Sequence, residues 1–270
     1  MQRLALSTAE IAYIDRGNGA PVLLIHGFPL DHTMWDAQIG ALAEHCRVIA
    51  PDLRGFGQSS LGLSKPDPII LMEEYAEDLY ALLEKLKISE PVVLVGFSMG
   101  GYVAWQFLRK YPQLVRALVQ CDTKAVADTD EARAGRLKMA DNVEEWGSAR
   151  VAEMMGPKLF APETFETKPH LVAAVRHVVE TTKPAAIAAA QCGMAKRPDM
   201  TSFLPTISVP TLIVCGAADA ISPPKEMQAI AAAIPNATYV EIPDAGHMTT
   251  MENPEAVNSA LLAFLESNLG

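Results

Sequence analysis

Long hydrophobic runs are absent from this 270-residue sequence, in which no uninterrupted stretch exceeds six residues. A helix that crosses a bilayer needs about 20 apolar residues, so we expect no membrane span. Basic residues are also scarce, because 22 Lys and Arg face 32 Asp and Glu and leave a net charge of −10. Nucleic-acid binders and proteins that lie on anionic membranes normally present a basic face. The charge therefore excludes nucleic acid and membrane as partners.

Cysteine is scarce and shows no paired spacing. The four cysteines are Cys46, Cys121, Cys192 and Cys215; no two form a CxxC pair, and three lie in or beside apolar runs. This usage favours buried, reduced thiols in a cytoplasmic protein. Residues 1–17 alternate apolar and polar side chains and contain no apolar h-region. They predict a strand rather than a signal peptide.

Apolar residues are plentiful, at 50% of the chain against 20% charged. A chain of this length and composition can bury the core of one large α/β domain. Several continuous apolar runs have the length of strands that are buried on both faces. These runs are 21–27, 47–52, 91–96, 116–122, 210–216 and 237–242, and two further runs, 2–7 and 10–14, predict an antiparallel hairpin at the sheet edge.

Helix-length segments separate most of these runs. In 74–87 and in 255–267 the apolar residues recur on one helical face. Strands that alternate with helices predict βαβ units. We therefore expect an α/β fold in which helices flank a mainly parallel, eight-stranded sheet.

No strand pattern occurs between Asp122 and Pro210, where several helical patterns are punctuated by prolines. We interpret 123–208 as a helical lid that is inserted between strands 6 and 7 and covers the carboxyl edge of the sheet. Residues 1–122 and 209–270 then form the core domain. A separately folded helical domain is the alternative.

The segment Gly96-Phe97-Ser98-Met99-Gly100 is the strongest chemical signal. It fits the pattern G-x-S-x-G and stands between a predicted strand and a helical stretch. A sharp turn at this place holds a serine hydroxyl clear of the backbone and next to a base that can activate it. We therefore predict that Ser98 is a nucleophile and that the N–H of Met99, at the start of the helix, stabilises an oxyanion.

Two histidines compete for the role of base. His247 follows the last predicted strand in Asp-Ala-Gly-His-Met, where small neighbours leave space for an imidazole to reach Ser98. His26 follows the third predicted strand, but an HG pair at a strand end is more often structural. We therefore assign the base to His247. The backbone N–H of Phe28 is expected to complete the oxyanion hole with that of Met99.

Two aspartates can orient this base, since Asp219 and Asp122 each follow a predicted strand. A carboxylate at either place fixes the tautomer of the imidazole and stabilises its charged form. We favour Asp219, because the loop formed by Gly216 and the following Ile-Ser-Pro-Pro suits that reach. Asp122 is expected to anchor the first turn of the lid.

Five motifs carry a resemblance that covers nearly the whole chain. They are, in order, HGFPLDHTMW, PDLRGFGQS, GFSMGG, GAADAISPP and AGHMTTMENPE. In order and spacing they are similar to the α/β-hydrolase superfamily, whose triad follows the chain order Ser, Asp, His. The segment CDTKAVADTDEARAGR resembles the branch of 3-oxoadipate enol-lactonase-like hydrolases and small-ester carboxylesterases. The resemblance implies hydrolysis of a small ester or lactone, with no metal and no organic cofactor.

Other activities of this superfamily stay open as alternatives. Ser98 excludes the dehalogenases and epoxide hydrolases, which use an aspartate nucleophile. A 3-oxoadipate enol-lactonase proper would need a cation for its substrate's carboxylate. The pairing of HGFP with FSMGG also resembles the cofactor-free haloperoxidases, and the SMGG elbow is shared with C–C bond hydrolases. A small-molecule receptor or signalling hydrolase that keeps its triad is the non-enzyme alternative.

Flexible apolar side chains are the candidates for a substrate pocket. Phe28 at the oxyanion hole, Met154 and Met155 in the lid, and Met248 beside the base are expected to line it. The expected partner is thus a small ester or lactone. No coiled-coil heptad or apolar interface stripe indicates the oligomeric state.

Overall fold

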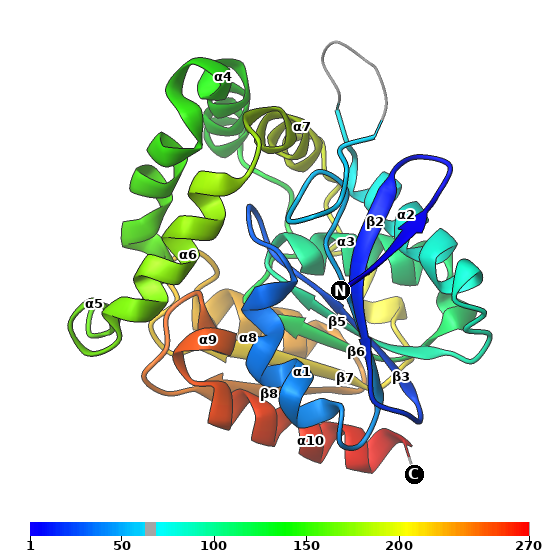
Figure 1. Ribbon diagram of the computed structural model, residues 1–270. Coiled ribbons are helices and arrows are strands. Elements are labelled where there is room, and N and C mark those ends of the chain that lie inside the picture. Colours follow the sequence, from blue (N-terminus) through cyan, green and yellow to red (C-terminus); the bar gives the residue numbers. More distant parts are fainter. Residues whose placement is uncertain (63–68, 270) are drawn as a thin grey trace.

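A twisted eight-stranded sheet forms the centre of the molecule (Figure 1). The structure is a computed structural model that describes residues 1–62 and 69–269. The strand order is β1-β2-β4-β3-β5-β6-β7-β8. Strands β1 and β2 pair antiparallel at one edge, β2 is also antiparallel to β4, and the other neighbours are parallel. The strands are β1 (Gln2–Ala5), β2 (Glu10–Arg16), β3 (Pro21–Ile25), β4 (Arg47–Pro51), β5 (Val92–Phe97), β6 (Val115–Cys121), β7 (Thr211–Gly216) and β8 (Ala237–Ile242).

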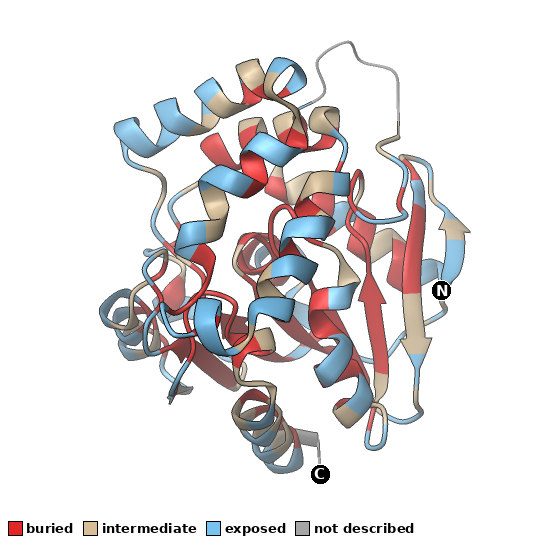
Figure 2. Cartoon of the chain, turned by 60° about the vertical axis from the view of Figure 1, so that its left-hand side comes forward, coloured by how far each residue is buried: buried red, intermediate tan, exposed pale blue. Residues whose placement is uncertain are grey.

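Helices cover both faces of this sheet. Every residue of β3, β5 and β7 is buried, as expected where a parallel strand is covered on both sides (Figure 2). In Figure 1, α1 (Asp36–Leu42) and α10 (Pro254–Leu269) lie in front of the sheet, and α2 (Met72–Lys85), α3 (Met99–Lys110) and α8 (Pro224–Ala233) lie behind it. The predicted α/β fold, its mainly parallel sheet and its edge hairpin are confirmed. Over the described residues, no helix combines the length and apolarity that crossing a membrane requires.

Four α-helices lie between β6 and β7, and we call this part the α4–α7 segment. They are α4 (Asp130–Leu159), α5 (Thr164–Thr167), α6 (Pro169–Thr181) and α7 (Pro184–Ala195). The backbone leaves the helical region inside α4 at Gly147, whose φ is 75°. Pro157 lies within α4 and does not end the helix.

Several contacts hold the α4–α7 segment to the core. Just outside its ends, Arg197 pairs with Asp128 at 2.7 Å, and the guanidinium of Arg197 lies 4.3 Å from the ring centre of Tyr102 in α3. At the end of α4, the carbonyl of Leu159 accepts a hydrogen bond at 2.9 Å from the N–H of Met248, which follows β8. The segment therefore spans from α3 to the loop that follows the last strand.

Short helices complete the chain. Helix α9 (Thr249–Glu252) precedes α10, and the 3₁₀ helices are η1 (His32–Trp35), η2 (Pro112–Leu114) and η3 (Leu204–Thr206). Through η1 the loop after β3 reaches α1, and η2 leads from α3 into β6.

Two helical glycines test how tightly the α4–α7 segment is seated. A Cβ at Gly193 in α7 would lie 1.8 Å from the carbonyl oxygen of Ile70, whereas one at Gly135 in α4 would meet nothing within 4 Å. We expect Gly193→Ala to lower the free energy of unfolding by about 1–3 kcal/mol through overpacking. Gly135→Ala, on an exposed helical turn, should raise it by about 0.5–1 kcal/mol. Urea unfolding of both variants measures the difference, and equal effects would contradict the close seating.

Candidate active site

A sharp turn between β5 and α3 carries Ser98. Its φ of 51° and ψ of −113° lie in a region that side-chain-bearing residues rarely adopt. The turn is held because the N–H of Ser98 donates to the carbonyl of Cys121 at 2.9 Å and Thr123 Oγ1 donates to the carbonyl of Ser98 at 2.7 Å. Such a turn presents the hydroxyl at the carboxyl edge of the sheet.

Close backbone packing explains the glycines around this turn. A Cβ at Gly100 would lie 2.2 Å from the carbonyl oxygen of Ile25, so α3 begins directly against the end of β3. A Cβ at Gly96 would lie 2.6 Å from the carbonyl oxygen of Gly100. Neither position accepts a side chain without moving backbone.

Ser98, His247 and Asp219 form one continuous hydrogen-bonded chain. The distance from Ser98 Oγ to His247 Nε2 is 3.0 Å, and that from His247 Nδ1 to Asp219 Oδ2 is 2.8 Å. Asp219 follows β7, and His247 follows β8. Both side chains are almost fully buried, and the ring of Phe97 packs 5.1 Å from that of His247. The three residues chosen from the sequence thus lie together.

Asp219 is surrounded by donors. Its Oδ1 accepts hydrogen bonds from the N–H groups of Ile221 at 2.7 Å and Ser222 at 3.0 Å. Burial acts to raise the pKa of Asp219, but the contact with His247 and these hydrogen bonds outweigh it and hold the pKa below its usual value. Asp219 is therefore ionised at neutral pH, as a group that orients and stabilises a charged imidazole must be.

Two backbone N–H groups lie beside the turn. Met99 is the first residue of α3, where the N–H has no intrahelical acceptor. Phe28 follows β3, whose end packs against the start of α3. Neither N–H donates to an acceptor within residues 1–62 and 69–269. The arrangement can supply two free donors to an oxygen near Ser98.

His26 has a different environment. Its Nε2 accepts a hydrogen bond from the N–H of Leu53 at 2.8 Å, and its Nδ1 lies 2.8 Å from the carbonyl of Gly27. Burial lowers the pKa of His26, so its ring is neutral. The backbone contacts on both ring nitrogens give His26 a structural role and leave His247 next to Ser98.

The chain matches the family model described as the α/β hydrolase fold over residues 20–254. It belongs to the α/β hydrolase fold family.

This α/β hydrolase is similar to solved and curated proteins that have several different activities. It is 44% identical to a thermophilic esterase from Thermogutta terrifontis, solved with malate bound, at a TM-score of 0.96 with 100% of both chains covered. It is 27% identical to the enol-lactonase from Burkholderia xenovorans LB400, at a TM-score of 0.89 over 98% of this chain and 100% of that one. It is 34% identical, over 93% of its length, to a dihydrolipoyllysine-residue acetyltransferase component of the acetoin cleaving system from Pseudomonas putida. The chain spans 64% of the length of that relative.

A buried glutamate ties the His247 loop of this α/β hydrolase to the α4–α7 segment. Glu252 Oε1 accepts from the N–H of Gly246 at 2.8 Å, and Oε2 accepts from the N–H of Ala161 at 2.8 Å and from Thr164 Oγ1 at 2.5 Å. Lys168 Nζ donates to the carbonyl of Glu252. Sequence reasoning missed this residue, although an acidic residue five positions after the proposed base was a signal.

Asp122 does not anchor the α4–α7 segment, so that expectation is wrong. Its Oδ1 accepts instead from the N–H of Gly216 and from Thr249 Oγ1, both at 2.9 Å. Asp122 is fully buried and has a φ of 49°.

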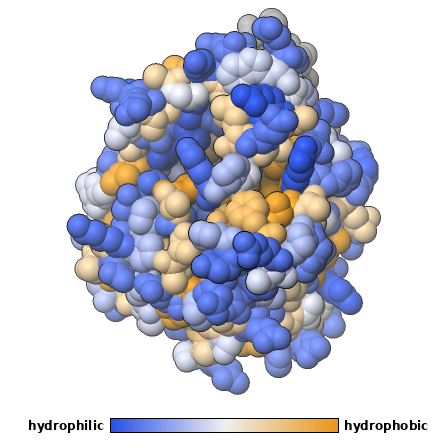
Figure 3. Space-filling view, turned by 90° about the vertical axis from the view of Figure 1, so that its left-hand side faces the viewer, coloured by the Kyte–Doolittle hydropathy of each residue, from blue (hydrophilic) through white to orange (hydrophobic). Residues whose placement is uncertain are grey.

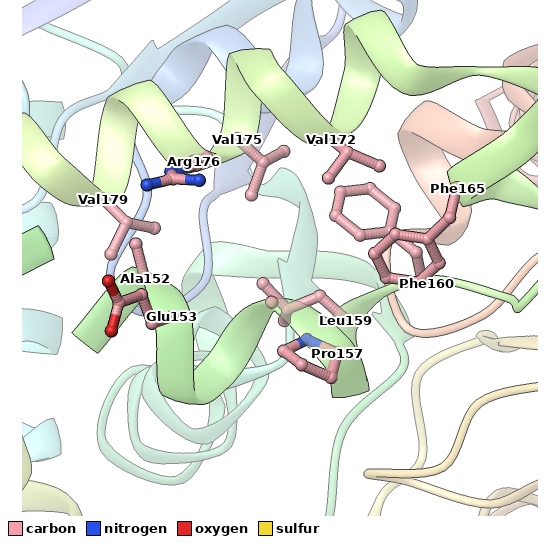
Figure 4. A pocket seen from close by; sticks show the side chains of 11 residues that line it. Ala152, Glu153, Pro157, Leu159, Phe160, Phe165, Val172, Val175, Arg176 and Val179 are labelled. Carbon is pink, nitrogen blue, oxygen red and sulfur yellow. The ribbon is translucent and has the colours of Figure 1, made fainter. Parts of the chain in front are cut away.

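An apolar cavity of about 180 Å³ lies between α4 and α6 (Figure 4). Phe160 and Phe165 stand at one end with ring centres 5.9 Å apart, and Arg176 and Glu153 stand at the other. Figure 3 shows apolar surface gathered in a hollow on the side of the molecule where these helices lie. The remaining lining residues are Ala152, Gly156, Pro157, Leu159, Val172, Val175 and Val179.

The four residues expected to line a substrate pocket lie in different environments. Met248 is fully buried, and Phe28 is buried with its ring 6.1 Å from that of Phe56. Met155 is half-buried, and Met154 is 41% exposed. None of the four lines the cavity between α4 and α6, so their contact with a substrate stays a prediction.

Two clusters of potential metal ligands occur among the described residues. Asp31, His32 and Asp52 form one, and Asp122, Cys215 and Asp219 form the other. In the first, His32 Nδ1 lies 2.7 Å from Asp52 Oδ1, and Asp31 Oδ1 accepts from the N–H of the residue two positions on. Hydrogen bonds within the protein therefore account for the first cluster, and a metal-free site stays the prediction.

Glu252→Gln tests the tie between the His247 loop and the α4–α7 segment. A glutamine has one acceptor oxygen, so one of the N–H groups of Gly246 and Ala161 would face an amide NH₂. We expect the free energy of unfolding to fall by about 1–3 kcal/mol, the cost of a buried unsatisfied donor. The exposed Glu255→Gln serves as the matched control and should change it by less than about 0.5 kcal/mol. Equal effects in urea unfolding would show that Glu252 makes no such tie.

Proposed function

We propose that this chain is a serine carboxylesterase that hydrolyses small esters or lactones through an acyl-enzyme intermediate. The observation that carries the proposal is the hydrogen-bonded chain Ser98–His247–Asp219 at a strand-to-helix turn. A serine hydroxyl is a weak nucleophile unless a positioned base takes its proton. The similarity to an esterase at 44% identity over the whole chain supports the same activity.

In the first half-reaction, Ser98 Oγ attacks the ester carbonyl while His247 Nε2 takes its proton. The N–H groups of Phe28 and Met99 hold the oxyanion, and such donors are typically worth about 2.7–4 kcal/mol each. Asp219 stabilises the imidazolium and keeps its Nδ1 proton in place. His247 then protonates the departing alkoxide, and the acyl group stays on Ser98.

In the second half-reaction, His247 takes a proton from water, whose oxygen attacks the acyl carbon. The tetrahedral intermediate collapses, the carboxylic acid leaves and the proton returns to Ser98. No metal or organic cofactor is required for either half.

The α4–α7 segment, with its flanks from 123 to 208, serves in this proposal as a lid over a core of residues 1–122 and 209–270. Its contacts support that role, since they reach the loops that follow β3 and β8. Thr182 Oγ1 donates to the carbonyl of Pro29 at 3.3 Å, and Leu159 accepts from Met248. Both loops carry residues assigned here to catalysis.

The arginines that the structure describes in this segment offer no unpaired guanidinium to an enol-lactone that bears a carboxylate, which favours a neutral ester. A carboxylate-bearing substrate needs an uncompensated cation near the pocket. Each of the five arginines between residues 123 and 208 already pairs with a carboxylate. The pairs are Arg133–Asp130, Arg136–Asp128, Arg150–Glu153, Arg176–Glu180 and Arg197–Asp128.

Steady-state hydrolysis of p-nitrophenyl acetate, butyrate and octanoate tests the proposal, with Ser98→Ala as the blank. We expect turnover of the short esters, and a loss of at least about 10³-fold in kcat in the variant, because the nucleophile is gone. Its melting temperature should stay close to that of the wild type. Wild-type turnover no faster than the blank would contradict the esterase assignment and favour the receptor alternative.

Asp219→Asn tests the assignment of the orienting carboxylate. The amide cannot stabilise the imidazolium and favours the wrong tautomer, so we expect kcat to fall by roughly 10⁴-fold. In the wild type, kcat/KM should rise with pH as the imidazole loses its proton. Asp52→Asn, at a buried carboxylate that bonds to His32 outside the triad, is the control for the loss of a buried charge. Similar losses of kcat in both variants would refute the assigned role.

A further inference from the structure

A second buried carboxyl lies next to the proposed triad acid. Asp122, Cys215 and Asp219 each place a side-chain atom within 4.8 Å of the others. All three residues are buried, and within the described part of the chain no lysine or arginine pairs with either aspartate. Two carboxylates this close, without a cation between them, cannot both be ionised.

The hydrogen bonds decide which carboxyl keeps its charge. Asp219 accepts two backbone N–H bonds and one from His247, and all three favour its ionised form. Burial and the charge of Asp219 raise the pKa of Asp122 well above its usual value, against the opposing hydrogen bonds from Gly216 and Thr249. The proton therefore resides on Asp122.

The position of that proton follows from the atoms of Asp122. Oδ1 already accepts from Gly216 and Thr249, whereas Oδ2 is buried and receives no hydrogen bond from any described residue. A protonated carboxyl has one O–H donor, which belongs on the oxygen without other partners. Three of the roughly four acceptor sites of Asp219 are occupied, so one remains for this O–H.

Cys215 does not compete for this position. Its Sγ lies 3.4 Å from the carbonyl oxygens of Gly216 and Ser222, which accept the hydrogen bond of the thiol. Burial raises the pKa of Cys215, so the thiol stays neutral. The acceptor left for an O–H of Asp122 is thus the carboxylate of Asp219, an oxygen of which lies within 4.8 Å of an oxygen of Asp122.

We propose that Asp122 is a neutral carboxylic acid that donates a hydrogen bond to the Asp219 carboxylate and thereby positions the triad. The role rests on the proposed function, because it acts through Asp219 and His247. One oxygen of Asp122 holds Asp219, and the other holds Thr249, two residues beyond His247. Asp122 is in this way a positioning residue for both partners of Ser98.

A neutral donor can be replaced by an amide, and this gives the functional test. In Asp122→Asn the amide oxygen accepts from Gly216 and Thr249, and its NH₂ donates to Asp219. We expect Asp122→Leu, which is close to Asp and Asn in size and is not β-branched at this φ of 49°, to lower kcat/KM for p-nitrophenyl acetate at least about tenfold, and Asp122→Asn to recover it to within about threefold of the wild type. Equal losses in the two variants would overturn the proposal.

The pH profile separates a neutral Asp122 from an ionised one. If Asp122 carried a negative charge, Asp122→Asn would make the protonated imidazole less favourable and move the rise of kcat/KM to lower pH. We expect the midpoint of the rise to stay in place. A downward shift of about half a pH unit or more would show that Asp122 is an anion.

Carbon-13 NMR of protein labelled at the aspartate carboxyl carbon tests the protonation state without an ester substrate. The Asp122 signal is assigned by its loss in Asp122→Asn. At pH 7 we expect it at the position of a protonated carboxylic acid, and a signal at the carboxylate position would refute the proposal. If the wild type hydrolyses no ester, the proposed function fails while this spectrum still decides the state of Asp122.

Discussion

Two close approaches of backbone to backbone fix the geometry of the site. Gly100 places the start of α3 against the end of β3, since a Cβ there would lie 2.2 Å from the carbonyl oxygen of Ile25. Gly216 does the same for the loops after β7 and β8, because its Cβ would lie 2.0 Å from the carbonyl oxygen of Gly246. The first contact sets the turn that carries Ser98 against the end of β3, and the second sets the loop of Asp219 against that of His247. Side-chain hydrogen bonds then act on loops whose separation is already determined.

Buried carboxyl groups also shape the site, and each is stabilised by a different set of hydrogen-bond partners. Asp219 has backbone N–H groups and an imidazole, and Glu252 has backbone N–H groups and a hydroxyl from another part of the chain. From the described residues Asp122 accepts only two hydrogen bonds, which are too few to stabilise a buried negative charge. In our proposal it therefore stays protonated and donates a hydrogen bond to Asp219. An interior of low polarity tolerates acidic groups only under such conditions. The same groups hold the loops that surround Ser98.

The sequence was informative where local chemistry decides the structure. The strand-to-helix turn at Ser98 and the alternation of strands and helices are local patterns. They predicted the fold and the meeting of Ser98, His247 and Asp219. The partners of Glu252 were not predictable, because Ala161 and Thr164 lie 91 and 88 residues away in the chain. Asp122 was misjudged for a similar reason, since its partner Thr249 is 127 residues distant. Contacts of this kind depend on how segments pack, which spacing alone does not reveal.

The attachments of the α4–α7 segment have a mechanical consequence, because they are spread along it. The ion pair of Arg197 and Asp128 rests on Tyr102 near the start of α3, and Glu252 holds the residues that follow α4. Between these places, Thr182 bonds to Pro29, and Gly193 in α7 packs directly against Ile70. A segment fixed at several separated points resists movement as one rigid body, and any single helix that moves has to break its own contacts with the core.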